Sequence, residues 1–227
     1  MHEVVSVPAD DAVAARLRGF GPVGLLAILV ILAGNLIVSP LSAVLVLAWA
    51  HRARIPWRDI GYVRPRSWIN GAVIGIAFGM ALKLLMKAVV MPLLGADPIN
   101  QAYHYLVGNS AALPGMIFAV TIGAGWGEET VFRGYLFERF GRLFGHGRGA
   151  KAAIVLLTAA VFGLAHYLEQ GLPGVQQGMI VGVVFGTIYA TTSRLWMLMC
   201  AHAAFDLTAL AIIYWDLETE VARLIFH

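Results

Sequence analysis

Three short segments inside apolar stretches of this 227-residue sequence carry six ionisable side chains. They fall in the segments EETVFR, FGLAH and HAAFD, as Glu128, Glu129, Arg133, His166, His202 and Asp206. A carboxylate and an imidazole in one site can take a proton from water and pass it to a leaving group, which is general acid–base chemistry. Because an ion at the centre of a membrane helix costs about 2.5–3.5 kcal/mol or more, such groups predict a functional site.

The spacing within each segment predicts which side chains meet. Glu129 and Arg133 are four residues apart, so on a helix they share a face and can form an ion pair. Glu128 is rotated from Glu129 by about 100° and is predicted to point elsewhere, free for chemistry. His202 and Asp206 have the same spacing, so the carboxylate can fix the imidazole tautomer.

Two further features of the sequence support a functional site formed by these segments. Phe162 and His166 are four residues apart, so the aromatic ring can pack on the imidazole. Gly123, Gly125 and Gly127 precede the glutamates, and we expect them to leave room for a substrate backbone or water.

The composition predicts an all-α, polytopic integral membrane protein. Hydrophobic residues make up 59% of the chain and charged residues 13%, whereas a soluble domain has about 25% charged residues. The net charge of +3 is explained by basic loops beside anionic lipid and does not indicate nucleic-acid binding.

Apolar runs long enough to cross a bilayer recur along the chain, since a span needs roughly 20 residues. The six predicted spans cover residues 21–50, 68–94, 112–137, 152–168, 174–192 and 195–215. A kink is expected near Asn35 and Pro40 in the first span. We predict one helical bundle over residues 21–215, with the ionisable motifs in 125–206, between a polar segment 1–20 and a tail 216–227.

Lysine and arginine positions predict the orientation. Basic residues occupy the loops 51–67 and 138–151 and position Arg194, whereas the alternate loops 95–110 and 169–174 contain no Lys or Arg. By the positive-inside rule, the basic loops face the cytoplasm and both termini lie outside. The abundance of Ala, Gly and Arg favours a prokaryotic cell (inner) membrane.

Two segments, 71–79 and 178–186, repeat glycine at every fourth residue. The pattern fits either an inverted repeat, as in transporters, or ordinary close packing of membrane helices. Lys83 and Lys87 are one turn apart in the second span, and we expect them to reach towards the membrane surface or to pair.

The three motifs together resemble the CAAX-protease and bacteriocin-processing family of intramembrane proteases. That family carries EExxxR, FxxxH and HxxxN in this order, and here they read EETVFR (128–133), FGLAH (162–166) and HAAFD (202–206). The resemblance implies a bundle of membrane helices around a polar cavity, and hydrolysis of a peptide bond in a membrane-associated protein or peptide.

The resemblance also implies roles for individual residues. Glu128 would activate water as general base, His166 would hold that water, and His202 with the residue at 206 would stabilise the oxyanion. The chain departs from the pattern at Asp206, because an ionised aspartate only accepts hydrogen bonds. We therefore expect Asp206 to orient His202, which alone faces the oxyanion. The expected supporting residues are Glu129, Arg133 and Phe162.

A cofactor is left open by the sequence. Carboxylates and imidazoles can hold a divalent metal such as zinc, which would make the protein a metalloprotease, or they can act without one. If a metal is bound, the candidate ligands are Glu128, Glu129, His166, His202 and Asp206.

Two other function classes fit the same sequence. A bacteriocin-immunity or scaffold protein would need no catalytic glutamate, and a proton-coupled transporter would use Glu and His as a relay. The substrate identity, including whether it is a prenylated CAAX-type protein, and the oligomeric state do not follow from the sequence.

Overall fold

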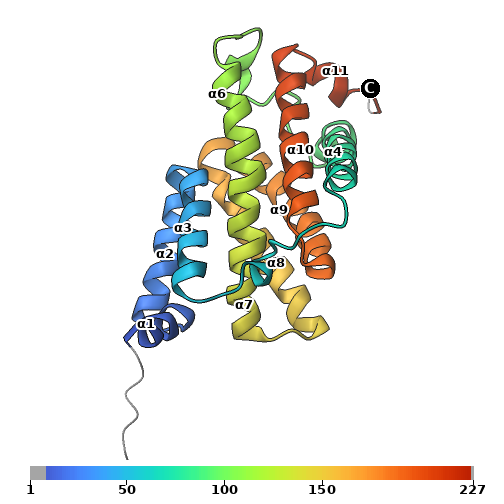
Figure 1. The fold of residues 1–227 in the computed structure, drawn as a ribbon. Helices are drawn as coiled ribbons and strands as arrows, with labels where there is room; N and C mark the ends of the chain where they lie inside the picture. The colour runs from blue at the N-terminus through green and yellow to red at the C-terminus, as the bar shows by residue number, and fades with distance from the viewer. Residues whose placement is uncertain (1–8, 226–227) are drawn as a thin grey trace, which may run out of the picture.

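The computed structural model describes residues 9–225, which contain helices and no strands (Figure 1). The principal helices are α1 (Ala9–Arg18), α2 (Pro22–Ile37), α3 (Ser39–Arg52), α4 (Trp68–Leu85), α8 (Arg148–Ala165), α9 (Tyr167–Thr192) and α10 (Trp196–Tyr214). One long central helix consists of α6 (Leu113–Phe118), the π-helical segment η4 (Ala119–Tyr135) and α7 (Leu136–Phe144). The short elements are η1 (Trp57–Ile60), η2 (Met86–Val90), α5 (Met91–Leu93), η3 (His104–Leu106) and α11 (Glu218–Ala222).

The prediction of one kinked span over residues 21–50 is wrong, because this run forms a helical hairpin. Val38 has an extended backbone (φ −150°, ψ 98°), so α2 ends there and α3 returns beside it (Figure 1). The Ser42 hydroxyl donates to the Ile31 carbonyl at 2.8 Å and ties the two helices together. The hairpin tip lies beside the middle of the long central helix rather than beyond its end (Figure 1).

The hairpin also changes where the described part of the N-terminus lies. The Arg18 guanidinium donates to the Ala53 carbonyl at 2.8 Å, which joins α1 to the end of α3. Arg139 of α7 donates to the carbonyls of Arg18 and Gly19, each at 2.8 Å. Helix α1 thus lies at the same end as two basic loops, whereas a single span would have placed it at the opposite end. Which end faces the cytoplasm stays a prediction.

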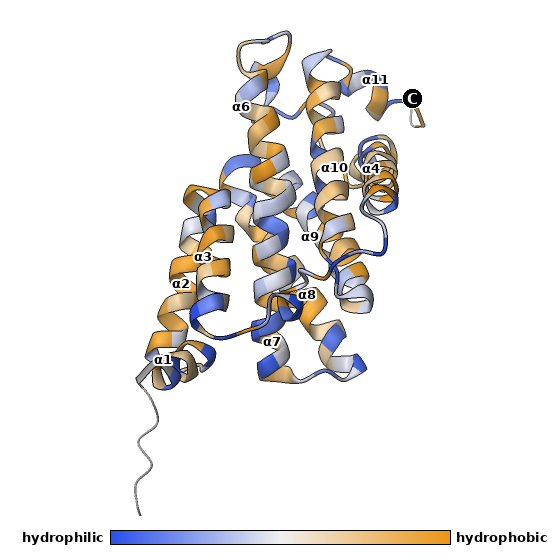
Figure 2. Cartoon of the chain, viewed as in Figure 1, coloured by the Kyte–Doolittle hydropathy of each residue, from blue (hydrophilic) through white to orange (hydrophobic). Residues whose placement is uncertain are grey.

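The predicted number of six spans is not confirmed. Within residues 9–225, four helices are long and apolar enough to cross a membrane: Trp68–Leu93, Arg148–Ala165, Tyr167–Thr192 and Trp196–Tyr214. A fifth is obtained if Asp11–Arg18 and Pro22–Asn35, which are bent by 63°, are taken as one span. Large apolar side chains are exposed on the outer faces of these helices, as expected where lipid is the solvent, while hydrophilic residues interrupt the middle of the central helix (Figure 2).

The glycine-repeat segments pack helices against each other. A Cβ added at Gly79 of α4 would lie 2.0 Å from the Ala201 carbonyl oxygen of α10, and one at Gly75 would lie 2.5 Å from the Met197 oxygen. At Gly182 of α9, an added Cβ would lie 2.8 Å from the Ala159 Cα of α8. Both segments therefore serve close approach of neighbouring helix backbones, as the ordinary-packing interpretation predicts.

The contact at Gly79 predicts a large effect of a single methyl group. Gly79→Ala should lower the free energy of unfolding by about 1–3 kcal/mol, because α4 and α10 must move apart. Gly149→Ala is the matched control, since an added Cβ there meets nothing within 4 Å. The measurement is a denaturation titration in detergent of both variants. Equal stability of Gly79→Ala and wild type would show that α4 and α10 do not pack as described.

Candidate active site

The central helix presents both glutamates from a widened, π-helical stretch. In η4 the backbone hydrogen bonds run from residue i+5 to residue i, as in the bond from Leu136 N–H to the Val131 carbonyl. π-Helical geometry is rare and often accompanies functional sites. The prediction that Glu128 points away from Glu129 assumed α-helical rotation. In the structure both carboxylates instead face His202 of α10.

At the glycines before the glutamates, the backbones of neighbouring segments pack closely against η4, so these glycines do not leave open space. A Cβ at Gly127 would lie 2.9 Å from the Ser39 carbonyl oxygen at the hairpin tip. A Cβ at Gly125 would lie 3.0 Å from the Met199 carbonyl oxygen of α10. The expectation of space for substrate is therefore wrong for these two positions. Their role is to let the hairpin tip and α10 approach η4 next to the glutamates.

Glu129 lies at the centre of a buried polar cluster. Its Oε1 accepts from Arg133 Nη1 at 2.8 Å and from His202 Nδ1 at 2.7 Å. The Glu129 side chain is fully buried and that of Arg133 is 2% exposed. The Arg133 guanidinium lies over the Phe162 ring at 4.6 Å and over the Phe185 ring at 5.4 Å. The predicted Glu129–Arg133 pair is confirmed, and it also holds His202.

The orientation of His202 follows from this cluster. An ionised carboxylate only accepts, so Nδ1–H donates to Glu129 and Nε2 is the nitrogen that faces the other carboxylates. From Nε2, Asp206 Oδ2 is 3.6 Å away and Glu128 Oε2 is 3.9 Å away. Asp206 was expected to orient His202. In the structure Glu129 contacts the orienting nitrogen, and Asp206 lies on the reactive side beyond hydrogen-bond distance.

Glu128 is held differently from Glu129. Its side chain is 17% exposed, and Oε2 has no hydrogen-bond donor among the residues that the structure describes. It lies in the wall of a cavity of about 750 Å³. As a carboxylate that lines the cavity, Glu128 can accept a hydrogen bond from a water molecule there.

His166 reaches the same cavity from the junction of α8 and α9. Its Nδ1 lies 2.8 Å from the Phe162 carbonyl oxygen, and since a carbonyl only accepts, Nδ1 carries the proton. In neutral His166 the other nitrogen, Nε2, is then the acceptor. The Phe162 ring packs on the imidazole at 4.8 Å between centroids, as the spacing predicts. A positive φ of 61° at Gly171 turns the chain from this junction into the rest of α9.

The structure brings all the predicted catalytic side chains into one cavity. Glu128, His166, His202, Asp206 and Phe162 line it together. The buried partners Glu129 and Arg133 lie behind His202 and do not line it. The three motifs, on three separate helices, therefore form one site.

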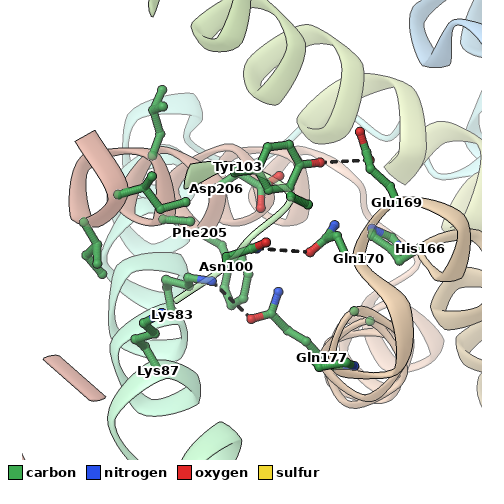
Figure 3. Close-up of a pocket in the computed structure, with 18 of the residues that line it drawn as sticks. Lys83, Lys87, Asn100, Tyr103, His166, Glu169, Gln170, Gln177, Phe205 and Asp206 are labelled. Carbon is green, nitrogen blue, oxygen red and sulfur yellow. Dashed lines mark hydrogen bonds between the residues drawn. The ribbon is translucent and has the colours of Figure 1, made fainter. Parts of the chain in front are cut away.

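The loop between α5 and α6, which the sequence analysis noted only for its lack of Lys and Arg, covers part of this cavity (Figure 3). Tyr103 donates to Glu169 of α9 at 2.9 Å. Burial, together with this hydrogen bond, raises the pKa of Tyr103 above its usual range, so the hydroxyl stays protonated and donates. Glu218 of α11 accepts from the Asn100 N–H at 3.0 Å and from Lys87 at 2.8 Å. These contacts fix the loop over the site.

The described side chains, as folded, do not form a metal site. Within residues 9–225, no group of three or more His, Cys, Asp or Glu is arranged to hold a metal ion. Glu129 is occupied by Arg133 and His202. The arrangement therefore gives no support for the zinc site that a metalloprotease would require.

Three contributors to the site were hardly indicated by the sequence. These are the hairpin tip at Ser39, the loop residue Tyr103, and Lys83, which lines the cavity. A signal existed only for Lys83, a lysine in the middle of an apolar span with no acidic residue within four positions.

Comparison with known proteins agrees with the three motifs. A family model described as Rce1-like, type II CAAX prenyl endopeptidase Rce1-like, matches residues 110–208. No curated protein and no solved structure matches the chain. The matched residues contain η4, α8, α9 and the part of α10 that carries His202 and Asp206.

Proposed function

We propose that the chain, whose residues 110–208 match the Rce1-like CAAX endopeptidase family model, is an intramembrane endopeptidase that uses Glu128 as general base. The observation that carries this proposal is the position of Glu128. This residue lines the cavity, and its Oε2 has no hydrogen-bond donor among the described residues and lies 3.9 Å from His202 Nε2. A carboxylate that is not held by hydrogen bonds from neighbouring side chains can take a proton from a bound water.

The proposed first step is attack by water on the scissile carbonyl carbon. Nε2 of His166 accepts a hydrogen bond from the attacking water and orients it, because Nδ1 is committed to the Phe162 carbonyl. Glu128 removes the water proton as the new C–O bond forms, and the carbonyl oxygen becomes an oxyanion. A protonated Nε2 of His202 donates to that oxyanion, while Glu129 holds Nδ1.

The second step returns the proton. Glu128, now protonated, gives its proton to the amide nitrogen as the C–N bond breaks, so the amine leaves neutral and Glu128 is ready for the next cycle. Asp206 lies 3.6 Å from His202 Nε2 and would help to keep that nitrogen protonated. This scheme needs only side chains that line or support the cavity.

The cavity supports a peptide segment as substrate. Its volume of about 750 Å³ lies in the range of about 300–1,000 Å³ found for small-molecule sites, and apolar residues such as Met91, Val181 and Ile213 share its lining. We therefore propose a membrane-associated protein or peptide, with a prenylated CAAX-type protein as one member of this class. The gathering of ionisable groups in one cavity, rather than along a path across the membrane, favours hydrolysis over proton-coupled transport.

This function can be tested by comparing peptide N-termini between cells that express wild type and cells that express Glu128→Gln at equal protein level. A new N-terminus present only with wild type would establish proteolysis and identify the substrate. Identical N-termini, with any cellular phenotype retained by Glu128→Gln, would favour an immunity or scaffold role instead.

A further inference from the structure

A second, smaller cavity lies beside the proposed catalytic pair. Its volume is about 200 Å³, and Glu128 and His166 line both this cavity and the larger one. Asn35, Phe132 and Ala165 line the small cavity and not the large one. The catalytic pair therefore borders two spaces, and the proposed peptide substrate occupies only the larger of them.

Polar side chains make up most of the lining of the small cavity. Besides Glu128 and His166, they are those of Asn35, Ser39 and Glu169. A space of about 10–15 Å³ with two to four polar partners is enough to hold one water molecule. The small cavity exceeds that size and supplies such partners, so it can hold several water molecules.

Asn35 brings an unmet hydrogen-bonding group to this lining. The residue lies in the last turn of α2, close to Val38, where the chain reverses. Its Oδ1 is buried and has no hydrogen-bond partner among the residues that the structure describes. Since buried polar atoms in proteins nearly always have a partner, a water molecule in the small cavity would complete the Asn35 amide.

The hairpin tip brings Asn35 into the same cavity lining as the proposed general base. A Cβ at Gly127 would lie 2.9 Å from the Ser39 carbonyl oxygen, so the tip contacts η4 directly before Glu128. The Ser39 hydroxyl donates to the Asn35 carbonyl at 3.5 Å, which links the end of α2 to this contact. The reversal of the chain at Val38 therefore places a polar side chain of α2 at the active site.

We propose that the small cavity supplies the hydrolytic water and that Asn35 positions this water for Glu128, an inference that rests on the proposed endopeptidase function. A peptide bound in the large cavity displaces water from it, so a separate polar space keeps water beside the general base. Glu169 is exposed and lines the small cavity, and because a carboxylate is costly in lipid, we expect water to enter past it. Asn35 is then a positioning residue that acts through the water.

The first test measures peptide hydrolysis by the full-length protein in detergent. Asn35→Leu removes the amide at similar size and should lower kcat by about tenfold or more, because the water loses its position. KM should change little, since the peptide binds in the large cavity, and the melting temperature should not fall, since no hydrogen bond to Oδ1 from a described residue is lost. Asn35→Ser, which again offers a group that binds water, should recover most of the rate. Asn70→Leu is the matched control, because Asn70 is exposed on α4 and lines neither cavity, and it should keep wild-type kcat and KM.

Two further experiments address the cavity itself. Ala165 lines only the small cavity, so Ala165→Leu should fill this space and lower kcat as Asn35→Leu does. A crystal structure of wild type at a resolution that shows ordered water should contain a water molecule hydrogen-bonded to the Asn35 side chain in the small cavity, and Asn35→Leu should lack it. Wild-type kcat in Asn35→Leu or Ala165→Leu, or no water at Asn35 in wild type, would overturn the proposal while leaving the endopeptidase function intact. Absence of any peptide cleavage by wild type would overturn both.

Discussion

Glu128→Gln is expected to reduce kcat for peptide hydrolysis by about 10²–10⁴-fold, the usual contribution of a general base. The amide keeps the size of the side chain but cannot take a proton from water. Since Glu128 Oε2 has no donor among the described residues, the substitution breaks no hydrogen bond at that atom. The melting temperature should therefore stay close to that of wild type while activity is lost.

The kinetic experiment uses purified protein in detergent with the substrate identified from cellular N-termini, or with a prenylated CAAX-type peptide. KM should change much less than kcat, because Glu128 is proposed to act on water rather than to bind the peptide. Glu220→Gln is the matched control, since Glu220 is exposed on α11 and does not line the cavity. Hydrolysis by Glu128→Gln at the wild-type rate would remove Glu128 from the role of general base.

Much of the site could be predicted from the sequence because its geometry is local. A spacing of four residues predicts that two side chains share a helix face. This holds for Glu129 with Arg133 and for Phe162 with His166, and both contacts are present. The convergence of the three motifs could also be predicted, since ionisable side chains in membrane helices face the interior of the bundle and pair with one another. The cavity that Glu128 shares with His166 and His202 is the result.

The hairpin could not be predicted because its cause is a single backbone conformation. Residues 22–52 are apolar on both sides of Val38, so the length of this apolar run alone predicts one membrane span. The extended backbone at Val38 reverses the chain, and Pro40 then occupies a helix N-terminal position, where proline is tolerated. The apolar composition is the same for a kink and for a reversal, so it does not distinguish them.

The remaining errors come from contacts between distant segments. The direction of Glu128 depends on the π-helical geometry of η4, which the i, i+4 pattern does not reveal. The partner of His202 Nδ1 is Glu129, 73 positions away, rather than the neighbouring Asp206. Lys83 likewise finds Gln177, 94 positions away. Local spacing identifies which side chains share a face, but not which neighbouring helix they meet.

The buried pair of Glu129 and Arg133 should matter to both stability and catalysis, and a pair of substitutions can separate the two. Arg133→Met alone leaves Glu129 as a buried charge without its guanidinium partner, so the free energy of unfolding should fall by about 3–5 kcal/mol. Glu129→Gln alone leaves Arg133 without its carboxylate, and a loss of similar size is expected. The double variant buries no ion at this position, and its stability should return close to that of wild type.

Activity should not return with stability in the double variant. Glutamine at 129 can still accept from His202 Nδ1, but it no longer supplies a charge to hold the imidazole in its protonated form. Loss of such an orienting partner costs about 10–100-fold in activity. We therefore expect kcat of Glu129→Gln/Arg133→Met to stay at least tenfold below wild type at equal melting temperature. If kcat recovers together with stability, the pair is structural and His202 is positioned by other contacts. If stability recovers alone, Glu129 is a positioning residue that acts through His202.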